Sequence, residues 1–260
     1  MRLAYLGGAF AGWQRQTHAR TVQGVIEQAL QVLYRQPVRV VGAGRTDAGV
    51  HAAGQVAHFD PRLPIPPAGV ASALNSLLPG DVRVLRAWAV PAGFHARRSA
   101  VGKRYRYRLA WGATLPPWEA LRRWHVGHPL DAGAVAATLA RVTGTHDFAA
   151  FALSGHSGHG ARGTVRTVTL ANLVVHGRRV DIVLEGDGFL RGMVRRVAGA
   201  LVEVGRGAQP PSWFAALLRD RNTLPPAPTA PPHGLTLERV SYGSRQHTAD
   251  STQPTADSLT

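Results

Sequence analysis

Apolar residues recur at the spacing of an amphipathic helix in two long stretches of the chain. Between 22 and 34 they fall three and four positions apart, after Thr21, which can cap a helix, and before Pro37, which closes it. A second stripe runs from Leu190 to Val204. We therefore expect two long helices, and shorter helices at 70–78, 131–142 and 211–219.

Strict alternation predicts a strand over residues 103–110. Tyr105, Tyr107 and Leu109 lie on one face of this strand, and the arginines at 104, 106 and 108 lie on the other. One face therefore meets a core or a cleft, whereas the other carries positive charge. Further strands are expected at 2–6, 38–41, 54–59, 82–90, 165–176, 179–185 and 235–242.

The helical and strand patterns follow one another in a similar order in both halves of the chain, which predicts an α+β fold with two related halves. The irregular, proline-containing segment 111–128 indicates a boundary, so the halves are placed at 1–110 and 111–243. After Gly243 the sequence is polar and aperiodic, and residues 244–260 are expected to form a disordered tail.

The charge of the chain indicates its partner. Thirty Lys and Arg residues against fifteen Asp and Glu give a net charge of +15, and Lys103 is the only lysine. Because the arginine fork binds phosphate and stacks on bases, this balance favours nucleic acid over a membrane surface as the partner. No apolar run approaches the roughly 20 residues of a membrane span, and we expect no signal peptide. The absence of cysteine excludes thiol catalysis and cysteine zinc sites, and fits a cytoplasmic protein.

The stretch G-A-G-R-T-D-A-G-V-H-A, residues 42–52, carries the candidate chemistry. Three glycines in its first eight residues allow positive φ and a close approach of a ligand to the backbone. Arg45 and Asp47 stand two positions apart, so the guanidinium can keep the carboxylate ionised and in place. For an arbitrary R-T-D string, a glycine-rich hairpin with surface charges would explain the same pattern.

The string G-R-T-D-A-G-V-H-A resembles the signature of the TruA family of tRNA pseudouridine synthases, and the resemblance extends over about 2–242. It implies a cytoplasmic, homodimeric isomerase that converts uridine to pseudouridine in the anticodon stem-loop of tRNA, at tRNA positions 38–40. It implies no metal and no cofactor. It also implies that the two halves join their mainly antiparallel sheets across a central basic cleft.

Four residues match catalytic positions of that family. Asp47 is then the catalytic aspartate, a nucleophile that forms and releases a covalent bond at C6 of the base or C1′ of the sugar. Tyr105 resembles the tyrosine that stacks on the target uracil. Arg195, in the M-V-R-R segment, matches the arginine that lies beside the aspartate. Arg45 is then the wedge that fills the place of the flipped base.

The loop that holds Trp13, Gln14 and Arg15 is predicted to bind RNA. The family shows a similar G-W-Q-R-Q here, and an aromatic ring among amides and guanidinium groups can meet unpaired bases. The alternative for Trp13 is a side chain that anchors the loop on the core.

Two further arginines are assigned, Arg97 by the same match and Arg191 by its charge. Arg97 is expected to support the site or the RNA. Arg191 and Arg195 are one helical turn apart, so they do not pair with each other and need an anion, which is either a phosphate or the carboxylate of Asp47.

Three positions depart from the family pattern. Asp187 and Arg196 stand where asparagine is commoner, and no acidic residue precedes the glycine of the first loop, which reads Gly7-Gly8. Asp187 adds a carboxylate near the expected cleft. His156 and His159, in the loop 152–163, form an H-x-x-H pattern, but no clustered carboxylate completes a metal site there. Two rival functions are a non-catalytic basic RNA-binding protein or tRNA chaperone, and a metal-dependent nuclease, which would need clustered carboxylates.

Overall fold

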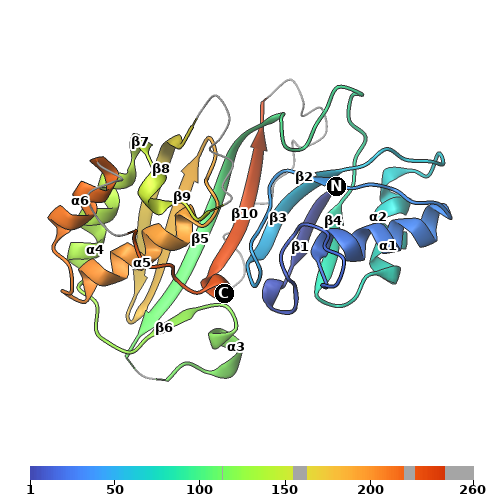
Figure 1. The fold of residues 1–260 in the computed structure, drawn as a ribbon. Helices are drawn as coiled ribbons and strands as arrows, with labels where there is room; N and C mark the ends of the chain where they lie inside the picture. Colours follow the sequence, from blue (N-terminus) through green and yellow to red (C-terminus); the bar gives the residue numbers. More distant parts are fainter. Residues whose placement is uncertain (113, 155–162, 220–225, 244–260) are drawn as a thin grey trace.

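The computed structural model describes residues 1–112, 114–154, 163–219 and 226–243, and its strands form one sheet (Figure 1). The strands are β1 (Arg2–Tyr5), β2 (Val41–Gly42), β3 (His51–His58), β4 (Val82–Arg86), β5 (Ala100–Trp111), β6 (Trp124–Val126), β7 (Gly144–Asp147), β8 (Val165–His176), β9 (Arg179–Gly186) and β10 (Leu235–Tyr242). Their order is β4-β1-β3-β10-β5-β9-β8-β7, with β2 paired to β3 and β6 to β5. All pairs are antiparallel except β10 with β3 and β5 with β6. The fold is therefore α+β, as predicted.

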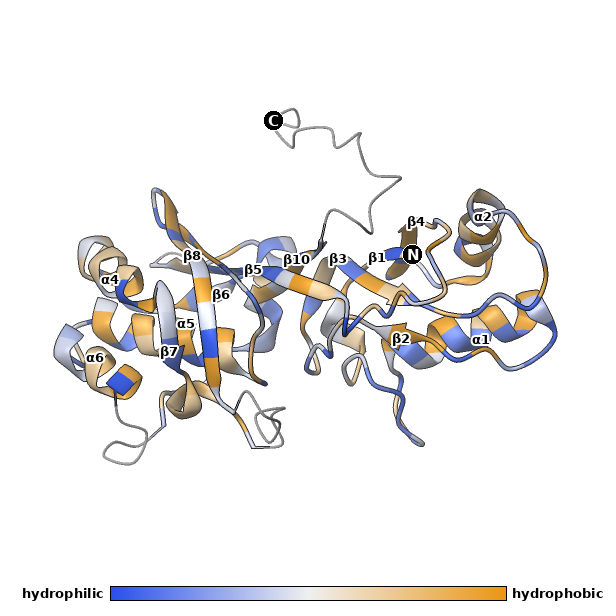
Figure 2. Cartoon of the chain, turned by 90° about the horizontal axis from the view of Figure 1, so that it is seen from above, coloured by the Kyte–Doolittle hydropathy of each residue, from blue (hydrophilic) through white to orange (hydrophobic). Residues whose placement is uncertain are grey.

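Two groups of helices lie at the two ends of this sheet (Figures 1 and 2). Beside β1 and β4 are α1 (Val22–Tyr34) and α2 (Pro67–Leu77). Beside β7, β8 and β9 are α4 (Ala132–Leu139), α5 (Met193–Gly205) and α6 (Pro211–Arg219). The short elements are α3 (Pro117–Ala120), η1 (Gly7–Ala9), η2 (Ala140–Val142), η3 (Ala149–Phe151) and η4 (Pro232–Gly234).

The last strand joins the two parts of the sheet. β10 pairs with β3 on one side and, over most of its length, with β5 on the other. β5 in turn pairs with β9 over eight consecutive positions, from Lys103 to Ala110. β10, from the second predicted half, thus pairs with two strands of the first, and β5 of the first half pairs with β9 of the second. The division at 110/111 itself stays a prediction.

The first helix begins as the sequence predicts, because the Thr21 hydroxyl accepts a hydrogen bond from the Gly24 backbone N–H at 3.2 Å. The second long helix begins later than the apolar stripe indicates. Gly192 has a φ of +73°, which no helix interior allows, so α5 starts at Met193. Arg191 therefore precedes the helix, and the expectation that Arg191 and Arg195 lie one turn apart within it was wrong.

Other segments also differ from expectation. Of the strand predicted at 38–41, only Val41 belongs to β2. The strand predicted at 82–90 ends at Arg86, because its partner β1 has four residues and Arg2 already pairs with Arg86. The segment 111–128, predicted to be irregular, contains α3 and β6. The three residues of β6 pair with Leu109–Trp111 of β5. A strand of three residues is too short to show a periodic pattern in the sequence.

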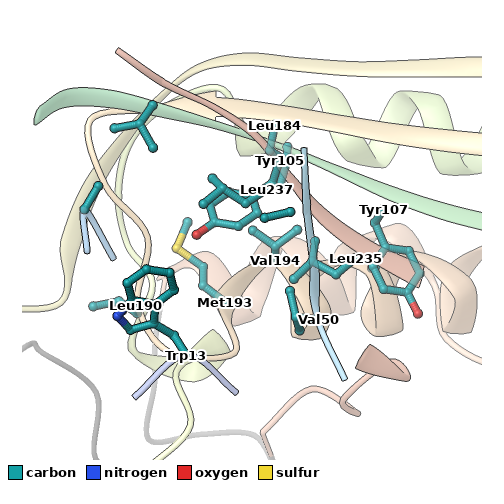
Figure 3. Close-up of a cluster of buried hydrophobic side chains, with 14 of the residues drawn as sticks. Trp13, Val50, Tyr105, Tyr107, Leu184, Leu190, Met193, Val194, Leu235 and Leu237 are labelled. Atoms are coloured by element: carbon teal, nitrogen blue, oxygen red, sulfur yellow. The ribbon is translucent and has the colours of Figure 1, made fainter. Parts of the chain in front are cut away.

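The alternation in β5 is confirmed. Tyr105, Tyr107 and Leu109 are buried. Figure 3 shows the two tyrosines beside leucines of β10 and apolar residues of α5. On the opposite face, Arg106 and Arg108 form ion pairs with Asp181 of β9 and Glu238 of β10. The apolar face of β5 therefore faces the core that lies between the sheet and α5.

Candidate active site

The loop that carries Asp47 lies between β2 and β3. Side chains of β1 and β3 form hydrogen bonds with it. The Tyr5 hydroxyl of β1 lies 2.9 Å from the Thr46 hydroxyl. The Gln55 amide of β3 donates to the Gly44 carbonyl at 2.8 Å. Because Thr46 and Gln55 are buried, these bonds are shielded from water and fix the backbone on both sides of Arg45.

Trp13 anchors a second loop against this one. Its side chain is only 3% exposed and lies 6.2 Å from the Tyr5 ring, between centroids. Its backbone N–H donates to the Thr46 carbonyl at 3.0 Å. A Cβ at Gly42 would lie 2.6 Å from the indole, so only glycine leaves room for the ring there. This burial fits the anchoring alternative for Trp13 and leaves little ring surface for an RNA base.

The Asp47 carboxylate is held by two arginines from the other end of the chain. Arg191 Nε lies 3.4 Å from Asp47 Oδ1, and Arg195 Nη1 lies 3.4 Å from Asp47 Oδ2. The two guanidinium groups differ in solvent exposure, since the Arg191 side chain is 54% exposed and the Arg195 side chain 14%. Water screens the first contact more than the second, so Arg195 is the stronger electrostatic partner.

Both arginines are fixed by backbone carbonyls. Arg195 Nε donates to the Ala230 carbonyl at 2.7 Å, and Arg191 Nη1 donates to the Ser154 carbonyl at 3.0 Å. The Ala230 N–H donates in return to the Arg195 carbonyl at 3.1 Å. The segment before η4 therefore orients the guanidinium that faces Asp47.

Arg45 does not pair with Asp47. Its side chain is exposed, and it has neither an ion pair nor a hydrogen bond with any residue that the structure describes. The pairing expected from the R-T-D spacing is thus not formed, because Arg191 and Arg195 already occupy the carboxylate. The anion that these two arginines need is Asp47, one of the two alternatives derived from the sequence.

Tyr105 projects from β5 toward the same region. The ring is 8% exposed and packs edge-on against Phe189, with 5.1 Å between ring centroids. Burial raises the pKa of the Tyr105 hydroxyl well above its ordinary value, and the nearby Tyr5 and Asp47 raise it further. The side chain is therefore a neutral aromatic ring at physiological pH.

These side chains line one open pocket with a volume of about 1200 Å³. Its walls come from the Asp47 loop, from β5 and from the segment that leads into α5. Among the predicted site residues, the pocket is lined by Trp13, Gln14, Arg45, Asp47, Arg97, Tyr105 and Arg191. Gln14 and Arg97 are exposed there, so both are accessible to a ligand.

The structure separates other predicted or suspected residues from this pocket. Arg15 is not among the lining residues, and its guanidinium lies 3.2 Å from Glu27 of α1. Asp187 is also outside the lining, and its carboxylate accepts a hydrogen bond from the Thr167 N–H of β8 at 3.2 Å. Arg196 donates to the Ala152 carbonyl at 2.8 Å and so supports the backbone behind the site.

Several lining residues were missed, among them Arg39, His95, Lys103, Phe189 and Met193. The signal for Lys103 was present, because strand alternation places it on the same face of β5 as Tyr105. Phe189 belongs to the irregular segment between β9 and α5, where no periodic pattern predicts the direction of a side chain. His156 and His159 lie outside the described residues.

A metal site is not found in the part of the chain that the structure describes, where no three histidine or acidic side chains gather closely enough to hold an ion. Among the same residues, none of the helices has the length and apolar character to cross a lipid bilayer.

A carboxylate held by two arginines, beside a neutral aromatic ring and in a pocket rich in cations, defines a candidate enzyme site for a nucleic acid base. The sequence model of the family described as tRNA pseudouridine synthase matches residues 3–97 and 139–243. The chain therefore belongs to the tRNA pseudouridine synthase family, whose members are isomerases that convert uridine to pseudouridine in tRNA.

Similar proteins cover nearly the whole chain. It is 41% identical to tRNA pseudouridine synthase A 1 of Desulfotalea psychrophila, over 92% of this chain and 97% of the relative. It is 42% identical to tRNA pseudouridine synthase A of Myxococcus xanthus, over 93% and 91%. It is 44% identical to the protein of that name from Frankia casuarinae, over 92% and 87%. The fold, the site and these relatives support an enzyme rather than a non-catalytic RNA-binding protein.

Proposed function

We propose that this enzyme isomerises uridines at positions 38 to 40 in the anticodon stem-loop of tRNA, with Asp47 as the nucleophile. The observation that carries the proposal is the Asp47 carboxylate, held between Arg191 and Arg195 in the pocket that Tyr105 also lines. Two guanidinium groups stabilise the ionised carboxylate and fix its direction, which is what a carboxylate nucleophile requires.

The reaction is an internal rearrangement. The bond between N1 of uracil and C1′ of ribose breaks, and a bond between C5 and C1′ forms. C5 loses a proton and N1 gains one, so atoms and electrons balance without a redox cofactor. Asp47 assists by a transient covalent bond, at C6 of the base or at C1′ of the sugar.

The target base leaves its stack before it reaches the carboxylate. Extrusion of a base costs a few kcal/mol, and stacking on an aromatic ring recovers part of this cost. Tyr105 supplies that ring, because it lines the same pocket as Asp47. Arg45, exposed and unpaired among the described residues, is the side chain placed to fill the gap left in the RNA.

The remaining predicted residues bind the RNA outside the reacting base. Gln14, Arg97 and Arg191 are exposed on the pocket wall, where they meet phosphates or base edges. The family resemblance adds that two copies of the chain act together as a homodimer, that tRNA reaches across both subunits, and that the reaction takes place in the cytoplasm.

The target positions are tested by mapping pseudouridine on an unmodified tRNA transcript. After incubation with the enzyme, carbodiimide treatment and primer extension should stop at uridines 38, 39 and 40. A transcript with cytidine at these three positions is the matched control and should give no new stops. New stops elsewhere in the tRNA would contradict the positional assignment while leaving the family activity intact.

A further inference from the structure

One cation on the pocket wall has no role in the site described so far. Lys103, the only lysine of the chain, lies on β5 two residues before Tyr105 and lines the same pocket. Its side chain is half-buried. Long cationic side chains normally extend into water or pair with a carboxylate, so an ammonium group held in a pocket wall needs an explanation.

The ammonium group rests against the loop that carries Asp47. A Cβ at Gly44 would lie 2.7 Å from Lys103 Nζ and 3.5 Å from Cε. Glycine at this position therefore makes room for the end of the lysine side chain. The Gly44 carbonyl accepts a hydrogen bond from Gln55, so the ammonium lies beside a fixed part of the loop.

The charged surroundings of Lys103 are mainly positive. Arg97 and Arg166 lie close enough to repel the ammonium, and its strand neighbours Gly186 and Val240 carry no charge. Within the described residues, Lys103 forms no ion pair and no hydrogen bond, and the Asp47 carboxylate is occupied by Arg191 and Arg195. Burial, and after it the charges of Arg97 and Arg166, lower the pKa of the Lys103 ammonium to about 8. Other ionisable groups that line the pocket are Arg39, Arg45 and His95.

We propose that Lys103, together with Arg97, forms a phosphate-binding subsite that holds a phosphodiester of the substrate strand next to the flipped uridine. The inference rests on the proposed function, because it takes RNA as the occupant of the pocket. A phosphodiester carries the negative charge that this cluster of cations lacks, and it restores the favourable environment of the buried ammonium. Lys103 is then a positioning residue that fixes the strand relative to Asp47, not a group that takes part in the bond changes.

The test compares Lys103→Met, which keeps the length of the side chain, with Lys103→Arg, which keeps the charge. The affinity for unmodified tRNA is measured against salt, and turnover is measured by release of tritium from C5 of uridine. Lys103→Met should bind tRNA about tenfold more weakly, and the slope of log affinity against log salt should fall by about one. Its turnover at saturating tRNA should match wild type, and Lys103→Arg should restore the affinity.

The pH profile supplies a readout that a merely structural role would not move. The lysine is charged below its pKa, so wild-type affinity should weaken as the pH rises through about 8. Lys103→Arg should show no such loss between pH 7 and 9, because arginine stays protonated. Arg141→Met, at an exposed position outside the pocket lining, is the control and should behave like wild type.

Three results would overturn the inference: an unchanged salt slope in Lys103→Met, a wild-type affinity that stays constant through pH 8, or a loss of turnover at unchanged affinity. The last result would place Lys103 in the chemistry instead. Each leaves pseudouridine formation by the wild-type enzyme in place, so failure of this inference is distinguishable from failure of the proposed function.

Discussion

The guanidinium of Arg195 lies 3.4 Å from the carboxylate of Asp47, although 148 positions separate the two residues in the chain. Arg195 comes from α5 and Asp47 from the loop before β3, and β10 joins the sheet regions that carry them. The Asp47 carboxylate therefore meets both arginines only when the sheet regions on the two sides of β10 have formed.

Replacement of Arg195 should affect turnover more than replacement of Arg191. Arg195→Met should lower kcat by about a hundredfold or more, because a poorly screened charge is lost beside Asp47. Arg191→Met should cost about tenfold or less, since its contact with Asp47 is largely exposed. Single-turnover kinetics of both variants, with circular dichroism to verify folding, give the comparison. Equal losses of kcat in the two variants would show that solvent exposure does not determine which contact with Asp47 matters more.

Tyr105 should act through its ring and not through its hydroxyl. Tyr105→Phe should keep most of the turnover, since the burial-raised pKa keeps the hydroxyl protonated in the wild-type enzyme. Tyr105→Leu fills much of the same space without a stacking surface, and should reduce kcat strongly with little change in tRNA affinity. A Leu variant with wild-type kcat would remove the stacking role.

Gly199 of α5 should be needed to orient Arg195. A Cβ at this position would lie 2.1 Å from the Pro228 carbonyl oxygen, next to the segment whose Ala230 carbonyl binds Arg195. Gly199→Ala should therefore destabilise the fold by about 1–3 kcal/mol and lower kcat as well. Thermal unfolding and turnover are the measurements.

Gly69→Ala in α2 is the matched control for Gly199→Ala. Its Cβ would meet only the Ile65 methyl group at 3.4 Å, and alanine favours the helix by up to about 1 kcal/mol. An unaltered melting temperature in Gly199→Ala would mean that the segment at 228–230 yields to the added methyl group.

Lys103→Met should stabilise the fold even though it weakens tRNA binding. The pKa of Lys103 is lowered to about 8 in the folded protein, so keeping the buried ammonium charged at neutral pH opposes folding. Removing it should raise stability by roughly 1–3 kcal/mol at pH 7. The gain should shrink as the pH rises from about 8 toward the ordinary lysine pKa, above which neither state is charged. Denaturant unfolding at pH 7 and pH 10 measures the gain in stability and its decrease with pH. A Lys103→Met variant that is less stable than wild type at pH 7 would contradict the prediction.

Sequence patterns placed the long elements because their periodicity is local. The helix at 22–34, the helix at 211–219 and the strand at 235–242 have the predicted bounds, and alternation gave both faces of β5. Local periodicity did not predict strands whose length or existence depends on the strand they pair with. β4 ends at Arg86, opposite Arg2, where β1 begins, and β6 forms through its pairing with β5.

In the candidate site too, the sequence identified single residues but not the contacts between distant ones. The family signature pointed to Asp47, and the charge of Arg191 and Arg195 indicated that both need an anion, but only the fold shows that Asp47 is this anion and that Arg45 is not its partner. The role of Trp13 was open in the sequence, since an aromatic residue in a loop suits either RNA or a core. The close approach of its ring to Gly42 depends on two loops meeting, which no local pattern encodes.

The most direct test of the central claim is to measure tRNA binding and pseudouridine formation in parallel for wild type and Asp47→Asn. Asparagine keeps the size of the side chain but is not a nucleophile at this position, and it removes a negative charge beside Arg191 and Arg195. Asp47→Asn should bind tRNA as tightly as wild type or more tightly, and should form no pseudouridine in the anticodon arm. Pseudouridine formation by Asp47→Asn at the wild-type rate would contradict the assignment of Asp47 as the nucleophile.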